Sequence, residues 1–272
     1  MDILDLHEFD RHLTRCIFCK QDSSTSKAVE HIIPEALGNK EHTLPRGVVC
    51  DSCNSYFGLK VERPLLDSAY FRQVRSRNRI YNKENRVPSA SGILLPGFVP
   101  IEMMWDKEGH SIFATRERDT SKLINALHHV QGGKIIEPIL ERPDEYLMSR
   151  LLAKMALEVL ASVFLAVPGG LDEVIDKSEL DELRHYARFG APPKFWPFNT
   201  RVIYPEGKMF AEGTQRYEVL HECKLLYTES SELYSVVAIL GTEYVINMGG
   251  PEIDGYIEWL KQHSFRSPLR HQ

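Results

Sequence analysis

The chain has 272 residues and a net charge of −5. Hydrophobic residues make up 43% and charged residues 26%, a balance typical of a globular protein that buries a core. The apolar runs fall short of the roughly 20 residues that a membrane span needs, which argues against a membrane protein. The acidic N-terminus lacks a signal-peptide core, so we expect a cytoplasmic protein.

Charge is divided unevenly along the chain. Residues 1–90 contain 14 Lys and Arg and 12 Asp and Glu, a net charge of +2, whereas the remainder contains 19 and 26, a net charge of −7. This distribution is compatible with an anionic partner that meets the N-terminal part alone.

The first motif along the chain is a pair of C-x-x-C sequences separated by 30 residues. The cysteines are Cys16, Cys19, Cys50 and Cys53. A thioredoxin-like redox motif needs one such pair, and a cytoplasmic chain rarely uses disulfides, so two pairs predict a tetrahedral structural zinc site. The surrounding sequence is polar, and we expect zinc to hold this small module folded. Cys223 stands alone and is interpreted as a small buried residue.

Between the cysteine pairs lies AVEHIIPEALGN, residues 28–39. Its first half predicts a short strand that ends in an adjacent acid and histidine, Glu30 and His31. The sequence GVV at 47–49 predicts the second strand of a hairpin. A helix is expected to begin at the second cysteine pair, with Asp51 or Ser52 as its N-cap.

These motifs together resemble the HNH endonucleases of the ββα-metal superfamily, and most closely the branch with a zinc ion bound by paired C-x-x-C motifs. The matching stretches are CIFC from Cys16, EHIIPEALGN from Glu30 and LPRGVVCDSCNSYFG from Leu44. The resemblance covers residues 14–62, which is under a quarter of the chain. It implies an N-terminal finger of strand, loop, strand and helix.

The resemblance also implies a mechanism. His31 would be the general base that activates water, and Glu30 and Asn54 would hold a catalytic Mg²⁺ or Mn²⁺. The residue that orients His31 is open at this point. Asn39 lies in the hairpin loop but could instead be a turn residue with positive φ, His42 is a second candidate, and a backbone carbonyl could do the same.

Basic residues within the motif and after it are candidate phosphate contacts. They are Arg46, Lys60, Arg72 and Arg75, continued by Arg77, Arg79, Lys83 and Arg86. Phosphate contacts would make binding fall steeply with salt, whereas the alternative is a solvated basic surface.

The rest of the chain predicts an α+β domain. A long core helix is expected over 144–167, with Lys154 and Glu158 the charged residues of its central part, and a shorter helix should end before Gly190. Strands are expected on both sides of the turn at 106–109, and a meander of three or four strands with a closing helix should follow residue 200. We therefore predict an HNH domain with zinc at 1–66, a basic connecting segment at 67–92 and an α+β regulatory or recognition domain at 93–272.

The predicted function is a metal-dependent DNA endonuclease, which the family resemblance would place in bacterial restriction or anti-phage defence. The alternatives are a non-catalytic zinc module that binds nucleic acid or protein, and a nuclease that cleaves RNA. The C-terminal domain could recognise a modified base, a ligand, a regulatory protein or a second copy of the chain. We expect no membrane partner.

Overall fold

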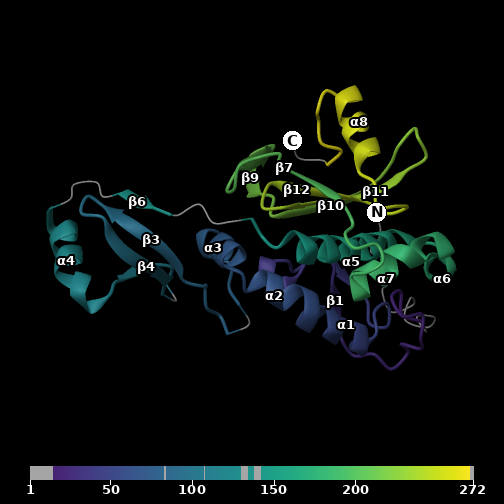
Figure 1. Ribbon diagram of the computed structural model, residues 1–272, viewed down its shortest axis with the longest axis horizontal. Coiled ribbons are helices and arrows are strands. Elements are labelled where there is room, and N and C mark those ends of the chain that lie inside the picture. The colour runs from purple at the N-terminus through teal and green to yellow at the C-terminus, as the bar shows by residue number, and fades with distance from the viewer. Residues whose placement is uncertain (1–14, 83, 107, 130–133, 138–141, 270–272) are drawn as a thin grey trace. The chain divides into compact units, whose positions relative to one another are not determined.

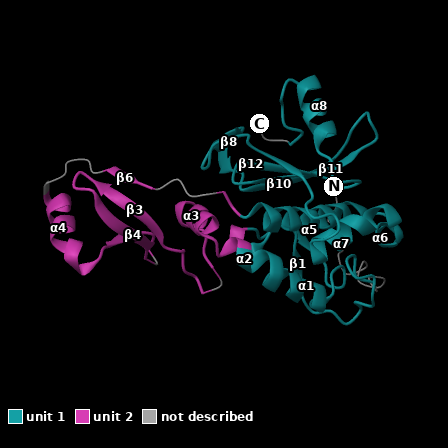
Figure 2. Ribbon diagram, in the orientation of Figure 1, with its two compact units in different colours: residues 1–35, 39–64, 144–272 teal, residues 36–38, 65–143 magenta. Residues whose placement is uncertain are grey.

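The computed structural model describes residues 15–82, 84–106, 108–129, 134–137 and 142–269 (Figure 1). Helices and antiparallel sheets are both present, which confirms the α+β class. The contacts divide the chain into two compact units (Figure 2). Unit 1 holds residues 1–35, 39–64 and 144–272, and unit 2 holds 36–38 and 65–143. No helix among the described residues is both long and apolar enough to cross a bilayer.

This division differs from the predicted boundaries. Most of the cysteine segment (residues 16–66) shares unit 1 with much of the predicted C-terminal domain; residues 36–38 and 65–66 belong to unit 2, as does the predicted connecting segment. The reason is packing: the long helix α5 (Glu145–Phe164) contacts the sheet of unit 1 on one side and the cysteine segment on the other (Figure 1). Fourteen of its side chains are buried, so α5 is the core of unit 1.

The cysteine segment begins with two short strands that pair antiparallel. Its elements are β1 (Glu30–His31), η2 (Glu35–Leu37), β2 (Thr43–Leu44), α1 (Asp51–Phe57), the π-helical η3 (Gly58–Glu62) and α2 (Arg63–Leu66). Glu30 pairs with Leu44 and His31 with Thr43. The helical run from Asp51 onward confirms the predicted helix.

The predicted second strand at 47–49 is wrong. Gly47 has a φ of +91°, which turns the chain after β2. Val48 and Val49 are buried, and the Val48 carbonyl accepts from the amide of Ile17, within the first cysteine pair, at 3.0 Å. The predicted N-cap is also wrong. The Cys50 sulfur caps α1 by accepting from the Cys53 amide.

The rest of unit 1 is a four-stranded antiparallel sheet with helices on both faces. The strands are β7 (Phe198–Val202), β10 (His221–Tyr227), β11 (Leu233–Ile239) and β12 (Thr242–Asn247), in the order β10-β11-β12-β7. The strands β8 (Met209–Glu212) and β9 (Gln215–Glu218) form a separate two-stranded sheet. The helix α8 (Asp254–Gln262) packs on this sheet through Tyr256 and Leu260, and its presence confirms the closing helix. The predicted meander is confirmed as well.

The helix predicted before Gly190 is broken in two. α6 (Gly170–Asp176) ends where Lys177 adopts an extended conformation, and α7 (Asp181–Phe189) follows. The Lys177 carbonyl accepts from the Arg184 guanidinium at 3.0 Å, which stabilises the break. Gly190 ends α7 in the left-handed conformation with a φ of +75°, as glycine permits.

Unit 2 has its own small core. It contains α3 (Ala69–Arg77), β3 (Ala90–Leu95), β4 (Val99–Trp105), β5 (Ser111–Ala114), α4 (Thr120–His129) and β6 (Lys134–Ile136), with sheet order β5-β4-β3-β6. Leu123 and Ala126 of α4 pack on Leu94, Val99 and Ile101 of the sheet. The basic stretch is therefore part of a folded unit, because its helix α3 buries Phe71 and Val74.

Candidate functional site

The four cysteines of the C-x-x-C motifs lie together. The sulfurs of Cys16, Cys19, Cys50 and Cys53 are all within 4.8 Å of one another. Two backbone amides point at sulfur: the Cys50 amide donates to Cys16 at 3.3 Å and the Cys53 amide to Cys50 at 3.4 Å. Four soft donors with supporting N–H groups suit a structural zinc ion.

The electrostatics of the cluster also favour a cation. A hydrogen bond with Cys53 lowers the pKa of Cys16 to about 5, and the same bond raises the pKa of Cys53. Burial raises the pKa of Cys50. Four neighbouring sulfurs cannot all ionise unless a positive charge lies among them, and a zinc ion supplies that charge. Arg188 of α7 adds a partial compensation, since its Nη1 donates to Cys53 Sγ at 3.2 Å.

The first cysteine pair is held by α6 and α7. Arg15 pairs with Asp172 at 2.6 Å and Asp176 at 2.8 Å, and Lys20 pairs with Asp181 at 2.6 Å. The buried Arg184 also donates from Nε to the Ile17 carbonyl at 2.9 Å.

Glu30 and His31 occupy β1, as predicted. Glu30 is 5% exposed and His31 is half-buried. One carboxylate oxygen of Glu30 accepts from Lys154 Nζ at 2.8 Å. The other oxygen, Oε2, and the Nδ1 of His31 are buried and have no hydrogen-bond partner within the described parts of the chain. Two such atoms on adjacent residues indicate a site made for a ligand, because leaving buried polar atoms unpaired costs free energy.

Asn54 follows directly on the zinc-type cluster. It lies in the first turn of α1, is half-buried, and its backbone amide donates to the Cys50 carbonyl at 2.9 Å. Glu30 and Asn54 offer hard oxygen donors, the type that Mg²⁺ and Mn²⁺ prefer, so the chemistry of this donor set fits such an ion.

Asn39 organises the loop between β1 and β2. Its buried amide donates to the carbonyls of Ile33 at 2.6 Å and His42 at 2.9 Å, and its Oδ1 accepts from the amides of Glu41 at 3.1 Å and His42 at 2.9 Å. The positive φ of this loop belongs to Gly38, at +89°, so the expected positive φ at Asn39 is wrong.

Neither loop candidate contacts the His31 ring in the hydrogen bonds of the described residues. Asn39 bonds to backbone alone, and His42 Nδ1 faces the sulfur of the half-buried Cys223 at 3.8 Å. Asn39 therefore acts on the site through the conformation of the loop that follows His31.

We expect Asn39→Ala to destabilise unit 1 by about 3 kcal/mol, because it removes four hydrogen bonds and leaves buried backbone groups unpaired. Asn39→Asp keeps the acceptor but puts a carboxylate oxygen against the Ile33 and His42 carbonyls in a buried position, so it should cost at least as much. Denaturant unfolding measures both. The comparison is Asn82, whose Oδ1 accepts two backbone amides in an exposed loop. A loss of unfolding free energy in Asn82→Ala as large as that in Asn39→Ala would contradict the structural role assigned to Asn39.

The predicted phosphate contacts differ in their surroundings. Arg46, Lys60 and Arg72 are exposed. Arg75 is half-buried, donates to the Leu66 carbonyl at 3.4 Å and has its pKa lowered by burial. Of the continuing basic residues, Arg77 pairs with Glu137 at 3.5 Å, Arg79 stacks on Trp105 at 4.2 Å, Arg86 is exposed and Lys83 lies outside the described residues.

Sequence reasoning missed the partners of Glu30. Lys154 is fully buried and pairs with Glu30 at 2.8 Å, Glu62 at 2.9 Å and Glu158 at 3.1 Å, and it contacts the His31 carbonyl at 3.3 Å. Burial opposes the charge on Lys154, but the carboxylates outweigh it and raise the pKa of the ammonium above its usual value. The sequence signal that could have revealed these partners was the charged pair Lys154 and Glu158, one turn apart in the apolar centre of α5.

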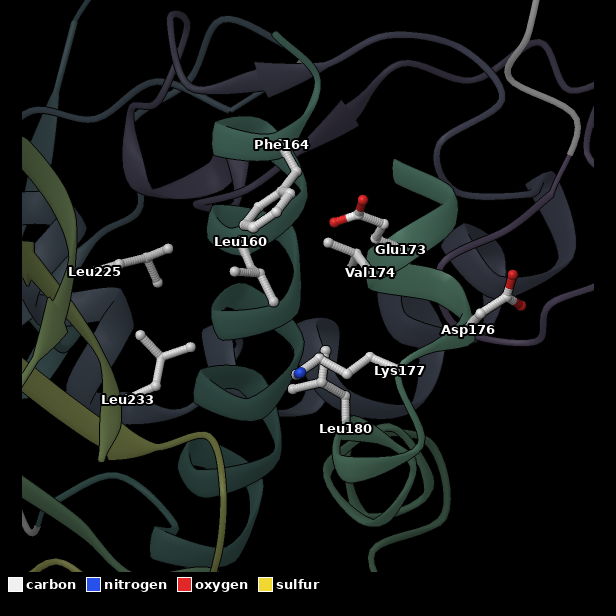
Figure 3. Close-up of a pocket in the computed structure, with 9 residues that line it drawn as sticks. All are labelled: Leu160, Phe164, Glu173, Val174, Asp176, Lys177, Leu180, Leu225 and Leu233. Carbon is white, nitrogen blue, oxygen red and sulfur yellow. The ribbon is translucent and has the colours of Figure 1, made fainter. Parts of the chain in front are cut away.

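Unit 1 also contains an apolar pocket of about 530 Å³ (Figure 3). Its lining residues are Leu160, Phe164, Glu173, Val174, Asp176, Lys177, Leu180, Leu225 and Leu233. The lining is mainly aliphatic and contains no histidine, so it offers no imidazole base of the kind that His31 could supply. In unit 2, Asp106, Glu108 and His110 form a mostly exposed acidic cluster in the β4–β5 turn.

Comparison with known proteins agrees with the motif. Residues 16–69 match the family described as HNH endonuclease, and the match spans about a fifth of the chain. The matched segment contains the four cysteines as well as Glu30, His31 and Asn54. The chain matches no curated protein and no solved structure. The resemblance seen in the sequence is confirmed for this segment, which matches the HNH endonuclease family.

Proposed function

We propose, from the HNH endonuclease segment at residues 16–69, that this protein is a metal-dependent endonuclease that hydrolyses phosphodiester bonds in DNA. The observation that carries the proposal is the pair of buried atoms, Glu30 Oε2 and His31 Nδ1, left without partners in the described residues of a segment that also forms a four-cysteine cluster. A scaffold that only bound nucleic acid or protein would gain nothing from unpaired polar atoms at these two positions.

His31 would act as the general base. A neutral imidazole accepts a proton near pH 7, and Nδ1 has no competing hydrogen bond in the described structure. The β1–β2 pairing fixes the backbone of His31 through Thr43, and Asn39 fixes the loop beyond it. The ring would therefore be held in place while it takes the proton from the attacking water.

Glu30 and Asn54 would hold the catalytic Mg²⁺ or Mn²⁺. Bound there, the ion stabilises negative charge on the phosphoryl oxygens and on the leaving 3′ oxygen. The chain's own contribution is to present one carboxylate oxygen from β1 and one amide oxygen from the first turn of α1. The zinc-type cluster would fix the backbone position of Asn54, because Cys53 belongs to the cluster and immediately precedes Asn54.

The exposed Arg46, Lys60 and Arg72 would bind phosphates and contribute no sequence readout. Each neutralised phosphate releases counterions, so we propose DNA binding that falls steeply with salt. By family resemblance we propose a setting in restriction or anti-phage defence, with a homodimer or a regulatory protein as a further partner.

Cleavage of plasmid DNA by the zinc-loaded chain tests the proposal. We expect nicked or linear product with Mg²⁺ or Mn²⁺ and no product in buffer freed of divalent ions, with zinc content measured in both. Parallel reactions with single-stranded DNA and RNA decide the substrate class. Absence of cleavage on every substrate would favour a non-catalytic zinc module, and cleavage of RNA alone would favour a ribonuclease.

A further inference from the structure

Lys154 lies inside a cage of oxygen atoms. Its ammonium nitrogen is 2.8 Å from Glu30 Oε1, 2.9 Å from Glu62 Oε1, 3.1 Å from Glu158 Oε2 and 3.3 Å from the His31 carbonyl. The four oxygens come from β1, η3 and α5 and surround one point. Lys154 and Glu158 have no exposed side-chain surface, and Glu30 is nearly buried.

Three carboxylate oxygens and a carbonyl oxygen around one point are also the donor types that a hard cation takes. Ca²⁺ and Mn²⁺ bind carboxylate and carbonyl oxygens, with Ca²⁺ distances of about 2.3–2.6 Å, so the cage would need to contract by roughly half an ångström to hold one. One ammonium also leaves the acidic cluster under-compensated. Two carboxylate oxygens, Glu30 Oε2 and Glu158 Oε1, are buried without partners in the described residues, which indicates capacity for further positive charge.

We propose that Lys154 is a tethered cation that fills a built cation site and thereby positions Glu30. The ammonium holds Oε1 and leaves Oε2 as the oxygen that Glu30 can offer elsewhere. This role rests on the proposed nuclease function: Lys154 leaves Glu30 Oε2 as the only oxygen of Glu30 that can bind the catalytic ion. Lys154 also keeps a second ion out of the cage. Lys154 is thus a positioning residue, supplied 124 positions downstream of Glu30.

The proposal predicts a gain of binding when the lysine is removed. Lys154→Ala leaves three carboxylates and a carbonyl around an open space, so the variant should take up one additional Ca²⁺ per chain with a dissociation constant of roughly 0.1 mM. Without Ca²⁺ the carboxylates lack a counter-charge, and the unfolding midpoint should fall well below that of the parent. At 10 mM Ca²⁺ the midpoint should rise by about 5 °C or more.

The experiment uses the zinc-loaded full chain in chelator-free buffer, with Asn54→Ala as the parent so that the proposed catalytic ion site is already impaired. Calorimetric titration with Ca²⁺ and thermal unfolding compare three proteins. They are the Asn54→Ala parent, the double variant Asn54→Ala/Lys154→Ala, and the triple variant that also carries Glu158→Gln. The parent should show no comparable response. Glu158→Gln removes one cage carboxylate and should weaken Ca²⁺ binding at least about tenfold.

Ca²⁺ is the probe because its binding is read without any cleavage assay. An inactive wild type together with a Ca²⁺-responsive Lys154→Ala variant would reject the nuclease function and keep the cage. A Lys154→Ala variant that gains no Ca²⁺ and no thermal shift overturns the cage, even if the wild type cleaves DNA. A variant that stays unfolded and zinc-free at 10 mM Ca²⁺ overturns it equally, because the cage predicts rescue by the cation.

Discussion

Cys50→Ser should release zinc and unfold the cysteine segment. Cys50 supplies one of the four sulfurs, so the substitution removes a thiolate ligand, whereas the serine hydroxyl can still cap α1, the helix that carries Asn54. Zinc binding in comparable sites is worth roughly 10–16 kcal/mol at neutral pH, which exceeds the net stability of many domains. Zinc content by mass spectrometry and loss of helical circular dichroism measure the effect.

The matched control for this prediction is Cys223→Ser. Cys223 is half-buried on β10 and contacts His42, and it lies outside the four-cysteine cluster. This variant should keep one zinc per chain and an unfolding transition near that of the wild type. A Cys50→Ser protein with full zinc content and wild-type unfolding would contradict the structural role of the cluster.

His31→Ala should lower the cleavage rate by about 10²–10⁴-fold, the range that a positioned general base contributes. The fold should survive, because His31 is half-buried and its ring makes no hydrogen bond with the described residues at Nδ1. Initial rates on supercoiled plasmid at saturating Mg²⁺ measure the loss. Zinc content and the thermal midpoint should match the wild type.

His263→Ala provides the control for this second prediction. His263 is exposed at the end of α8, where it stacks on Trp259, and it lies outside the HNH segment. Its removal should leave the cleavage rate within about twofold. If His31→Ala cleaved at the wild-type rate, another group would have to be the base, and the proposed mechanism would fail even though the zinc module remained.

The pattern of nearby residues was sufficient for much of this protein. The two C-x-x-C spacings predicted a cluster that the structure forms, and the match at residues 16–69 confirms the family resemblance drawn from the same residues. Apolar periodicity predicted α5 and strand composition predicted the β10–β12 meander. These features depend on short-range spacing, which sets which side chains share a face or a turn.

Errors arose where a local pattern had more than one solution. The stretch at 47–49 has strand-like composition, but Gly47 turns the chain, both valines are buried, and the Val48 carbonyl accepts from the Ile17 amide inside the first C-x-x-C motif. Likewise, Asp51 and Ser52 are ordinary N-cap residues, yet the Cys50 sulfur is held by the cluster in the position that caps α1. In both cases a contact with the cysteine cluster outweighed the local preference.

The sequence by itself determined the chemical character of the site: four thiol ligands, an adjacent acid and histidine, and an asparagine at the start of a helix. The tertiary structure alone decided that the site extends to α5 and α7, where Lys154 meets Glu30 and Arg188 meets Cys53 across 124 and 135 positions. It also decided that residues 65–143, which interrupt unit 1 along the sequence, form a separate unit with residues 36–38. Such contacts depend on how whole elements pack, and no spacing within a short window encodes that packing.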